Sequence, residues 1–131
     1  MKDFNMSDYS GGLQHIGIPT KDMDKTMEFY GLLGFKETYE TMNGSSKVVF
    51  MALGNLCMEF YEAEDACGKT GAIDHVAIDV NDIEAVYEYV GGLGFESLEK
   101  QICFLPFFDK GVRYFTILGP NAEKVEFNQK L

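Results

Sequence analysis

The chain has 131 residues, 46% of them hydrophobic, which is enough to bury a core as one globular body. Its 21 acidic residues outnumber 11 basic ones, and the net charge of −10 argues against nucleic-acid binding, which needs clustered Lys and Arg. The first ten residues hold no apolar run, and no later stretch approaches the roughly 18 apolar residues of a membrane span. Three cysteines without CxxC spacing suit a reducing compartment. We therefore expect a cytoplasmic protein with no membrane partner.

An internal repeat organises the sequence, because the stretch from Gln14 to Asp22 is matched by the stretch from Asp74 to Asp82. A constant spacing that relates the only two histidines is typical of two structural modules that pair to complete one core. We predict an N-terminal lead-in at residues 1–12 and a single domain at 13–131, with module one at 13–64 and module two at 72–129. The matches, each 60 residues apart, are His15 with His75, Ile18 with Ile78, Asp22 with Asp82, and Gly34-Phe35 with Gly94-Phe95.

Module one begins with alternating apolar residues that predict a strand from Leu13 to Thr20. Asp22 is the expected N-cap of a short helix, and Gly34 is expected to stop that helix. Three further strands are predicted at 35–42, 47–53 and 56–62, and Asn43-Gly44 is a hairpin turn between the first two. Module one is therefore expected to run strand, helix, then three strands.

The two faces of these strands differ in chemistry. Along strand 56–62, Met58 and Phe60 would face the helix, which places Glu59 on the opposite face together with His15. Module two repeats this order, with strands at 73–80, 95–101, 112–118 and 124–129 and a helix at 82–91. In its last strand Glu126 takes the place that Glu59 has in module one. We expect an α+β fold of two βαβββ modules, whose curved mixed sheets enclose a cleft between their helix-free faces.

Four residues that occupy matching positions in the two modules form a candidate metal site: His15, Glu59, His75 and Glu126. Any one of them alone on a strand is more often an ordinary surface or core residue. All four on the same predicted face of a repeat favour ligation of one divalent metal, because two imidazoles and two carboxylates suit a borderline metal. Water positions would remain open, so the site would be catalytic in character.

The sequence resembles the vicinal oxygen chelate superfamily, and in particular its glyoxalase I (lactoylglutathione lyase) branch, from Leu13 to Gln129. The resemblance implies that His15, Glu59, His75 and Glu126 hold one divalent metal, with Ni or Co expected from the compact length and Zn also accepted. The motifs that carry it are HIGI, HVAI, FYGLLGF, Met58-Glu59-Phe60, and Gly119-Pro120-Asn121 followed by Val125-Glu126-Phe127.

The resemblance also implies an activity: metal-dependent proton transfer through a chelated enediolate, which converts a hemithioacetal of a 2-oxoaldehyde and a thiol into a thioester. In glyoxalase I a glutamate ligand acts as the base, so the resemblance favours Glu126 as base and Glu59 as its partner, although the sequence alone does not rank them. Family members usually form homodimers, which pack modules within a chain or exchange them between chains.

The expected substrate is a small molecule, and the chain departs from the family where glutathione should bind. Compact glyoxalases carry an arginine and an asparagine where this chain has Pro19 and Ala63. Lys110 and Lys124 are the candidates to replace them. One alternative is a methylmalonyl-CoA epimerase-like enzyme, although the extra catalytic glutamate of those enzymes is replaced by Ser46-Lys47-Val48. Another is a bleomycin-resistance-like binding protein, which works without metal.

Overall fold

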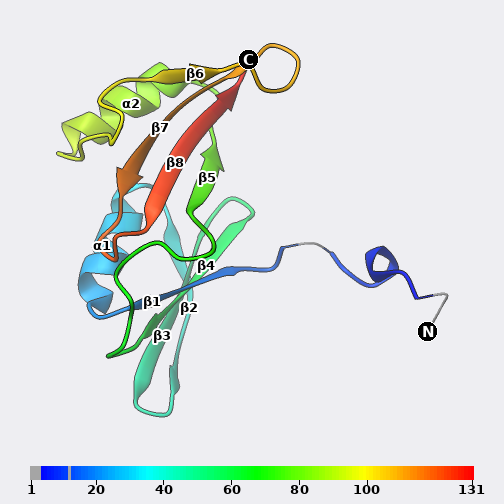
Figure 1. The fold of residues 1–131 in the computed structure, drawn as a ribbon. Coiled ribbons are helices and arrows are strands. Elements are labelled where there is room, and N and C mark those ends of the chain that lie inside the picture. Colours follow the sequence, from blue (N-terminus) through cyan, green and yellow to red (C-terminus); the bar gives the residue numbers. More distant parts are fainter. Residues whose placement is uncertain (1–3, 12) are drawn as a thin grey trace.

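The protein, represented by a computed structural model, is described at residues 4–11 and 13–131, so the lead-in predicted at 1–12 lies partly outside the described residues. Figure 1 shows residues 4–11 running out from the sheets. In chain order the elements are η1 (Met6–Asp8), β1 (Ile16–Thr20), α1 (Met23–Leu32), β2 (Lys36–Asn43), β3 (Ser46–Leu53), β4 (Leu56–Glu62), β5 (His75–Asp79), α2 (Ile83–Gly92), β6 (Cys103–Leu105), β7 (Val112–Leu118) and β8 (Lys124–Lys130).

The strands form two four-stranded sheets of identical topology, one per module. Their orders are β1-β4-β3-β2 and β5-β8-β7-β6. β1 runs parallel to β4, and β5 runs parallel to β8. The other strand pairs are antiparallel, so both sheets are mixed. Figure 1 shows the second sheet above the first, with both helices on the left of the view. The α+β class with two βαβββ modules is confirmed.

The two helices start and end by the same local chemistry, as the repeat predicts. The side chain of Asp22 accepts a hydrogen bond from the backbone N–H of Lys25 at 3.0 Å, and Asp82 accepts one from Ala85 at 3.1 Å. Each therefore satisfies a free donor of the first turn. Gly34 and Gly94 follow the helices at φ of +96° and +94°, a conformation that side chains other than glycine rarely adopt.

Each first strand is shorter than predicted, since β1 begins at Ile16 and β5 at His75 rather than at 13 and 73. Pairing sets these limits, because the register of β1 with β4 begins at the pair of Ile16 with Met58. His15 therefore lies just before its strand, whereas His75 opens its strand.

The predicted strand at 95–101 is wrong. In module one the corresponding segment is β2, which pairs with β3 along its length, but in module two only Cys103–Leu105 pairs with β7. The backbone N–H of Thr116 on β7 donates instead to the Glu99 carboxylate at 2.7 Å, and the carbonyl of Thr116 accepts from Leu98 N–H at 2.8 Å. A side chain thus takes a donor that a neighbouring strand would use, and the segment leaves the sheet as a loop.

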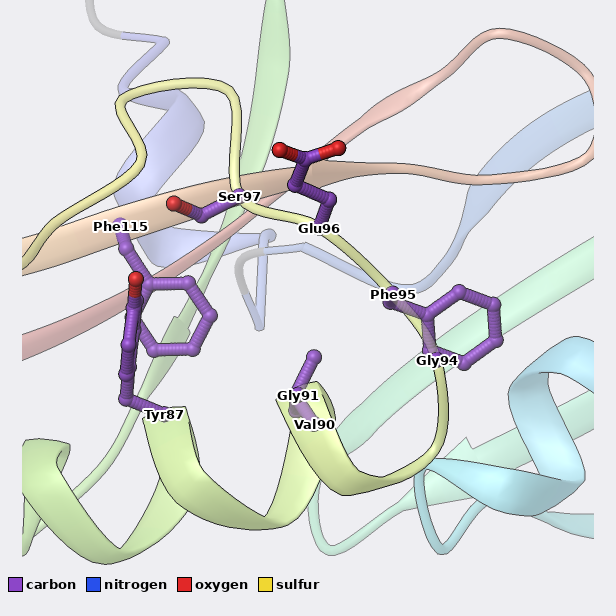
Figure 2. Close-up of a pocket in the computed structure, with 8 residues that line it drawn as sticks. All are labelled: Tyr87, Val90, Gly91, Gly94, Phe95, Glu96, Ser97 and Phe115. Atoms are coloured by element: carbon purple, nitrogen blue, oxygen red, sulfur yellow. The ribbon is translucent and has the colours of Figure 1, made fainter.

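This loop leaves a hollow of about 310 Å³ against α2 (Figure 2). The Ser97 hydroxyl is buried there and has no hydrogen-bond partner among the described residues. A buried hydroxyl of this kind usually pairs with an ordered water. The hollow lies on the helix side of the second sheet and is lined by Tyr87, Val90, Gly91, Gly94, Phe95, Glu96, Ser97 and Phe115.

One hydrophobic core joins the modules, because its buried residues come from both sheets and both helices. Across the joint the rings of Phe29 on α1 and Phe95 of module two lie 5.1 Å apart, edge to face. Tyr30 is fully buried and its hydroxyl donates to the Glu123 carboxylate at 3.0 Å. Burial, followed by the nearby charge of Glu123, raises the pKa of Tyr30 above its usual range, so this hydroxyl stays a donor.

We expect Tyr30→Phe to lower the free energy of unfolding by about 1–2 kcal/mol, because the partly buried Glu123 carboxylate then loses one of its donors. Urea denaturation measures this change. The matched control is Tyr39→Phe at an exposed tyrosine on β2, which should cost less than about 0.5 kcal/mol. Equal effects of the two substitutions would contradict a stabilising role for the contact between the modules.

Both helices are ten residues long, and no helix in the described part of the chain has the length and apolar character needed to cross a bilayer.

Candidate metal centre

The first candidate pair, His15 and Glu59, lies on the helix-free face of the first sheet. On β4 the buried Met58 and Phe60 alternate with Glu59, so the carboxylate points away from the core. The parallel register sets Gly17 of β1 beside Glu59. His15 lies two residues before Gly17. The His15 Nε2 and Glu59 Oε1 atoms lie 3.6 Å apart.

The second pair, His75 and Glu126, repeats this geometry in the second sheet. Ala77 of β5 is set beside Glu126 in the parallel register with β8, and His75 lies two residues before Ala77. The His75 Nε2 and Glu126 Oε1 atoms are again 3.6 Å apart. The same register at the same two places of the repeat therefore produces two equivalent histidine and glutamate pairs.

Each pair has a geometry that fits two ligands of one divalent ion. Imidazole nitrogen and carboxylate oxygen lie about 2.1 Å from such an ion, so two ligand atoms of one ion are at most about 4.2 Å apart. The observed 3.6 Å lies within this limit. The other ring nitrogen is occupied in both histidines, since His15 Nδ1 donates to Gln14 Oε1 at 2.9 Å and His75 Nδ1 donates to Asp74 Oδ2 at 3.0 Å.

In a neutral ring these contacts hold the proton on Nδ1, so that the Nε2 lone pair is free for a metal shared with the glutamate, an arrangement common for metal-ligating histidines. The chain places Gln14 and Asp74 immediately before the two histidines. Sequence reasoning missed both as supporting residues, although their matched place in the repeat was a signal that could have found them.

The two pairs differ in their support. Asp74 also accepts a hydrogen bond from Lys124 Nζ at 3.0 Å, and the hydrogen bonds from His75 and then from Lys124 lower the pKa of the Asp74 carboxyl. The second oxygen of Glu126 accepts from Asn128 Nδ2 at 3.0 Å. Glu126 is also less exposed than Glu59, with 15% against 27% of the side chain accessible. Glu126 is therefore held more firmly than Glu59, whereas the His75 side chain, at 44% exposed, is more open than that of His15, at 33%.

The two pairs do not meet within one chain. Over residues 4–11 and 13–131 no group of three or more His, Cys, Asp or Glu side chains is placed to hold a metal ion. A single chain thus presents two half-sites with two potential ligands each, one on each helix-free sheet face.

A hollow of about 420 Å³ lies directly beside Glu59 and is lined by Gly17, Asn43, Ser46, Val48, Glu59, Tyr61 and Glu62. No basic residue is among these seven. Lys124, one of the two lysines that are candidates to hold an anionic substrate, pairs with Asp74 at 3.0 Å. Pro19 pairs with Tyr61 in the register of β1 with β4, so the position at which the resemblance to glyoxalase I implies an arginine carries no charge.

The profile of the Glyoxalase/Bleomycin resistance protein/Dioxygenase superfamily matches residues 12–101, which include His15, Glu59 and His75. Among curated proteins, the uncharacterized protein YwbC of Bacillus subtilis is 28% identical over 127 residues, covering 90% of this chain and 97% of YwbC.

Solved structures share the fold over nearly the whole chain. A glyoxalase family protein from Enterococcus faecalis superposes with a TM-score of 0.77 at 19% identity, covering 90% of this chain and 97% of that chain. The fosfomycin resistance protein FosX from Listeria monocytogenes, in a complex with Mn(II) and sulfate, superposes with a TM-score of 0.71 at 20% identity, covering 93% and 94%.

Proposed function

Because the chain belongs to the Glyoxalase/Bleomycin resistance protein/Dioxygenase superfamily, we propose that it is a metal-dependent lyase or isomerase of the glyoxalase I type. The single observation that carries this proposal is the pair of equivalent half-sites, each with a histidine nitrogen and a glutamate oxygen 3.6 Å apart. Two such half-sites supply the four ligands that the resemblance to glyoxalase I implies, namely His15, Glu59, His75 and Glu126.

The complete centre requires two chains. Since no group of three ligands forms among the described residues of one chain, the half-site of module one needs the half-site of module two from another copy. A two-fold axis that brings these faces together generates two complete and identical centres per homodimer. We therefore place one divalent metal in each of two centres, with Ni or Co favoured, and Zn or Mn as further candidates.

The metal, when bound, would polarise two neighbouring oxygens of the substrate and so acidify the carbon next to a carbonyl. Glu59 borders the open hollow, and among the described residues its carboxylate lies near the His15 imidazole, so we assign to it the role of taking the proton from that carbon and returning it to the adjacent carbon. Glu126 is held by Asn128 and keeps its position as a ligand. This assignment differs from the resemblance, which favours Glu126 as the base.

Elemental analysis of protein purified without chelator tests the proposal. We expect about one metal per chain after reconstitution with Ni, Co, Zn or Mn. Each chain contributes two half-sites, so a dimer holds two complete centres. The loaded protein should isomerise hemithioacetals of methylglyoxal, with glutathione and 2-mercaptoethanol as the two thiols compared. The control is the double variant His15→Ala with His75→Ala, which should bind no metal at this stoichiometry. Failure to bind any metal would overturn the enzyme proposal and favour a binding protein of the bleomycin-resistance type.

A further inference from the structure

We propose that the hollow against α2 is a binding site for a small uncharged phenol. This inference goes beyond the proposed function, because the hollow lies on the helix side of the second sheet and shares no residue with the two histidine and glutamate pairs. In a homodimer joined through the helix-free faces it lies outside the interface. Its volume of about 310 Å³ is at the lower end of the range of small-molecule sites.

The internal repeat shows which side chain is missing from this part of module two. Val90 stands 60 residues after Tyr30, at the matching place on the second helix. In module one the Tyr30 ring is fully buried, with its centroid 4.6 Å from that of Phe60 and 5.1 Å from that of Phe35. Val90 is also buried but carries no ring. The hollow of module two therefore has room for a guest with the size and shape of a tyrosine ring.

The walls of the hollow are aromatic and are held by contacts of their own. The Tyr87 and Phe115 rings meet edge to face, with their centroids 4.9 Å apart. The ring of Phe95 packs against Phe29 of α1 at 5.1 Å. Figure 2 shows the Tyr87 and Phe115 rings on the left of the hollow, Phe95 on the right and Val90 below. The walls are thus formed before a guest enters, and aromatic rings favour a further ring beside them.

The Ser97 hydroxyl supplies one polar group for such a guest. The Ser97 side chain is buried, lines the hollow, and its hydroxyl has no hydrogen-bond partner among the described residues. Its loop is fixed to β7, because the carbonyl of Thr116 accepts from Leu98 N–H and the Thr116 N–H donates to Glu99. A phenol hydroxyl can donate to Ser97 or accept from it, and so replace the water that otherwise pairs with this group.

The lining favours an uncharged guest. None of the eight residues that line the hollow is Lys, Arg or His, so an anion would be buried there without a counter-charge. The one acidic residue, Glu96, is exposed, and Figure 2 shows its carboxylate pointing away from the aromatic rings. A phenol, which is neutral at pH 7, therefore fits this site better than an aromatic carboxylate does.

The test follows the backbone amide signals of the full chain by NMR during titration with phenol, toluene and benzoate. We expect phenol to shift the signals of Gly91, Gly94 and Ser97 in a saturable way, with a dissociation constant of roughly 1 mM for so small a ligand. Benzoate should bind about tenfold or more weakly. The phenol affinity should be the same with and without added zinc, so the result does not depend on the metal centre. Phenol shifts that do not saturate, or that fall on other parts of the chain, would overturn the site.

The substitution Ser97→Ala tests the hydrogen bond. Phenol and toluene have nearly the same shape, and only phenol can pair with the Ser97 hydroxyl. The ratio of phenol affinity to toluene affinity should therefore fall about fivefold or more in the variant. The matched control is Ser45→Ala, at an exposed serine that does not line this hollow, which should leave the ratio unchanged. An unchanged ratio in Ser97→Ala would contradict the role given to this hydroxyl.

The substitution Gly91→Leu tests the place of the guest by filling the hollow. A Cβ atom at Gly91 would meet no atom within 4 Å, and leucine favours a helix more than glycine does, so we expect the fold to be kept. Phenol affinity should fall about tenfold or more, because the leucine side chain takes the room of the ring. The matched control is Gly92→Leu, the next residue of α2, which is equally open and does not line the hollow. Phenol binding that is equal in the two variants would overturn the site.

Discussion

A mixture of His15→Ala chains and Glu126→Ala chains is expected to regain about a quarter of the wild-type activity, although each variant alone forms inactive homodimers. The reason is that the lesions lie in different modules. In a mixed dimer, module one of the Glu126→Ala chain and module two of the His15→Ala chain are both intact and form one complete centre. Random mixing makes about half of the dimers mixed, and each carries one working centre of two.

Differently tagged chains, unfolded together and refolded, allow the mixed dimer to be purified and its metal counted. We expect about one metal per mixed dimer. The matched control combines His15→Ala with Glu59→Ala, which places both lesions in module one. Neither centre of that mixed dimer is intact, so no activity should return. Absence of recovery in purified dimers of the first kind would show that the ligands of a centre come from one chain.

Glu59→Gln is expected to lower kcat by about 10²–10⁴-fold at saturating metal, because an amide can still ligate, although more weakly than a carboxylate, but cannot accept a proton. Glu126→Gln is expected to weaken metal affinity by about 10–100-fold, since it disturbs a ligand that Asn128 orients. Turnover of Glu126→Gln should return to near the wild-type rate at saturating metal, whereas that of Glu59→Gln should not. Metal titration of both variants, followed by assay at saturation, separates the two roles.

The opposite result has a clear meaning. If Glu126→Gln stays inactive at saturating metal and Glu59→Gln recovers, the base is Glu126, as the resemblance to glyoxalase I implies. Similar loss in both variants at full metal occupancy would show that the two carboxylates act together. The structural difference that favours Glu59 is its place beside an open hollow, against the hydrogen bond that holds Glu126.

The sequence by itself determined the helix caps, the outward facing of the two glutamates and the fold class. Asp22 and Asp82 cap their helices because a carboxylate oxygen satisfies a free N–H within the same turn. The alternation of side chains along β4 and β8 places Glu59 and Glu126 on the helix-free faces without reference to the rest of the chain. The fold class followed from the same patterns repeated 60 residues apart.

Only the tertiary structure decided which segments pair and which half-sites meet. The repeat predicts a strand at 95–101, but the Glu99 side chain occupies a backbone donor of Thr116 on β7, and such competition has no local signature. The arrangement of the modules depends likewise on long-range contacts, among them the Tyr30 hydroxyl on Glu123. These contacts bind α1 to module two and leave the two histidine and glutamate pairs apart within one chain, which a repeat pattern cannot reveal because each module carries the same pattern in either arrangement.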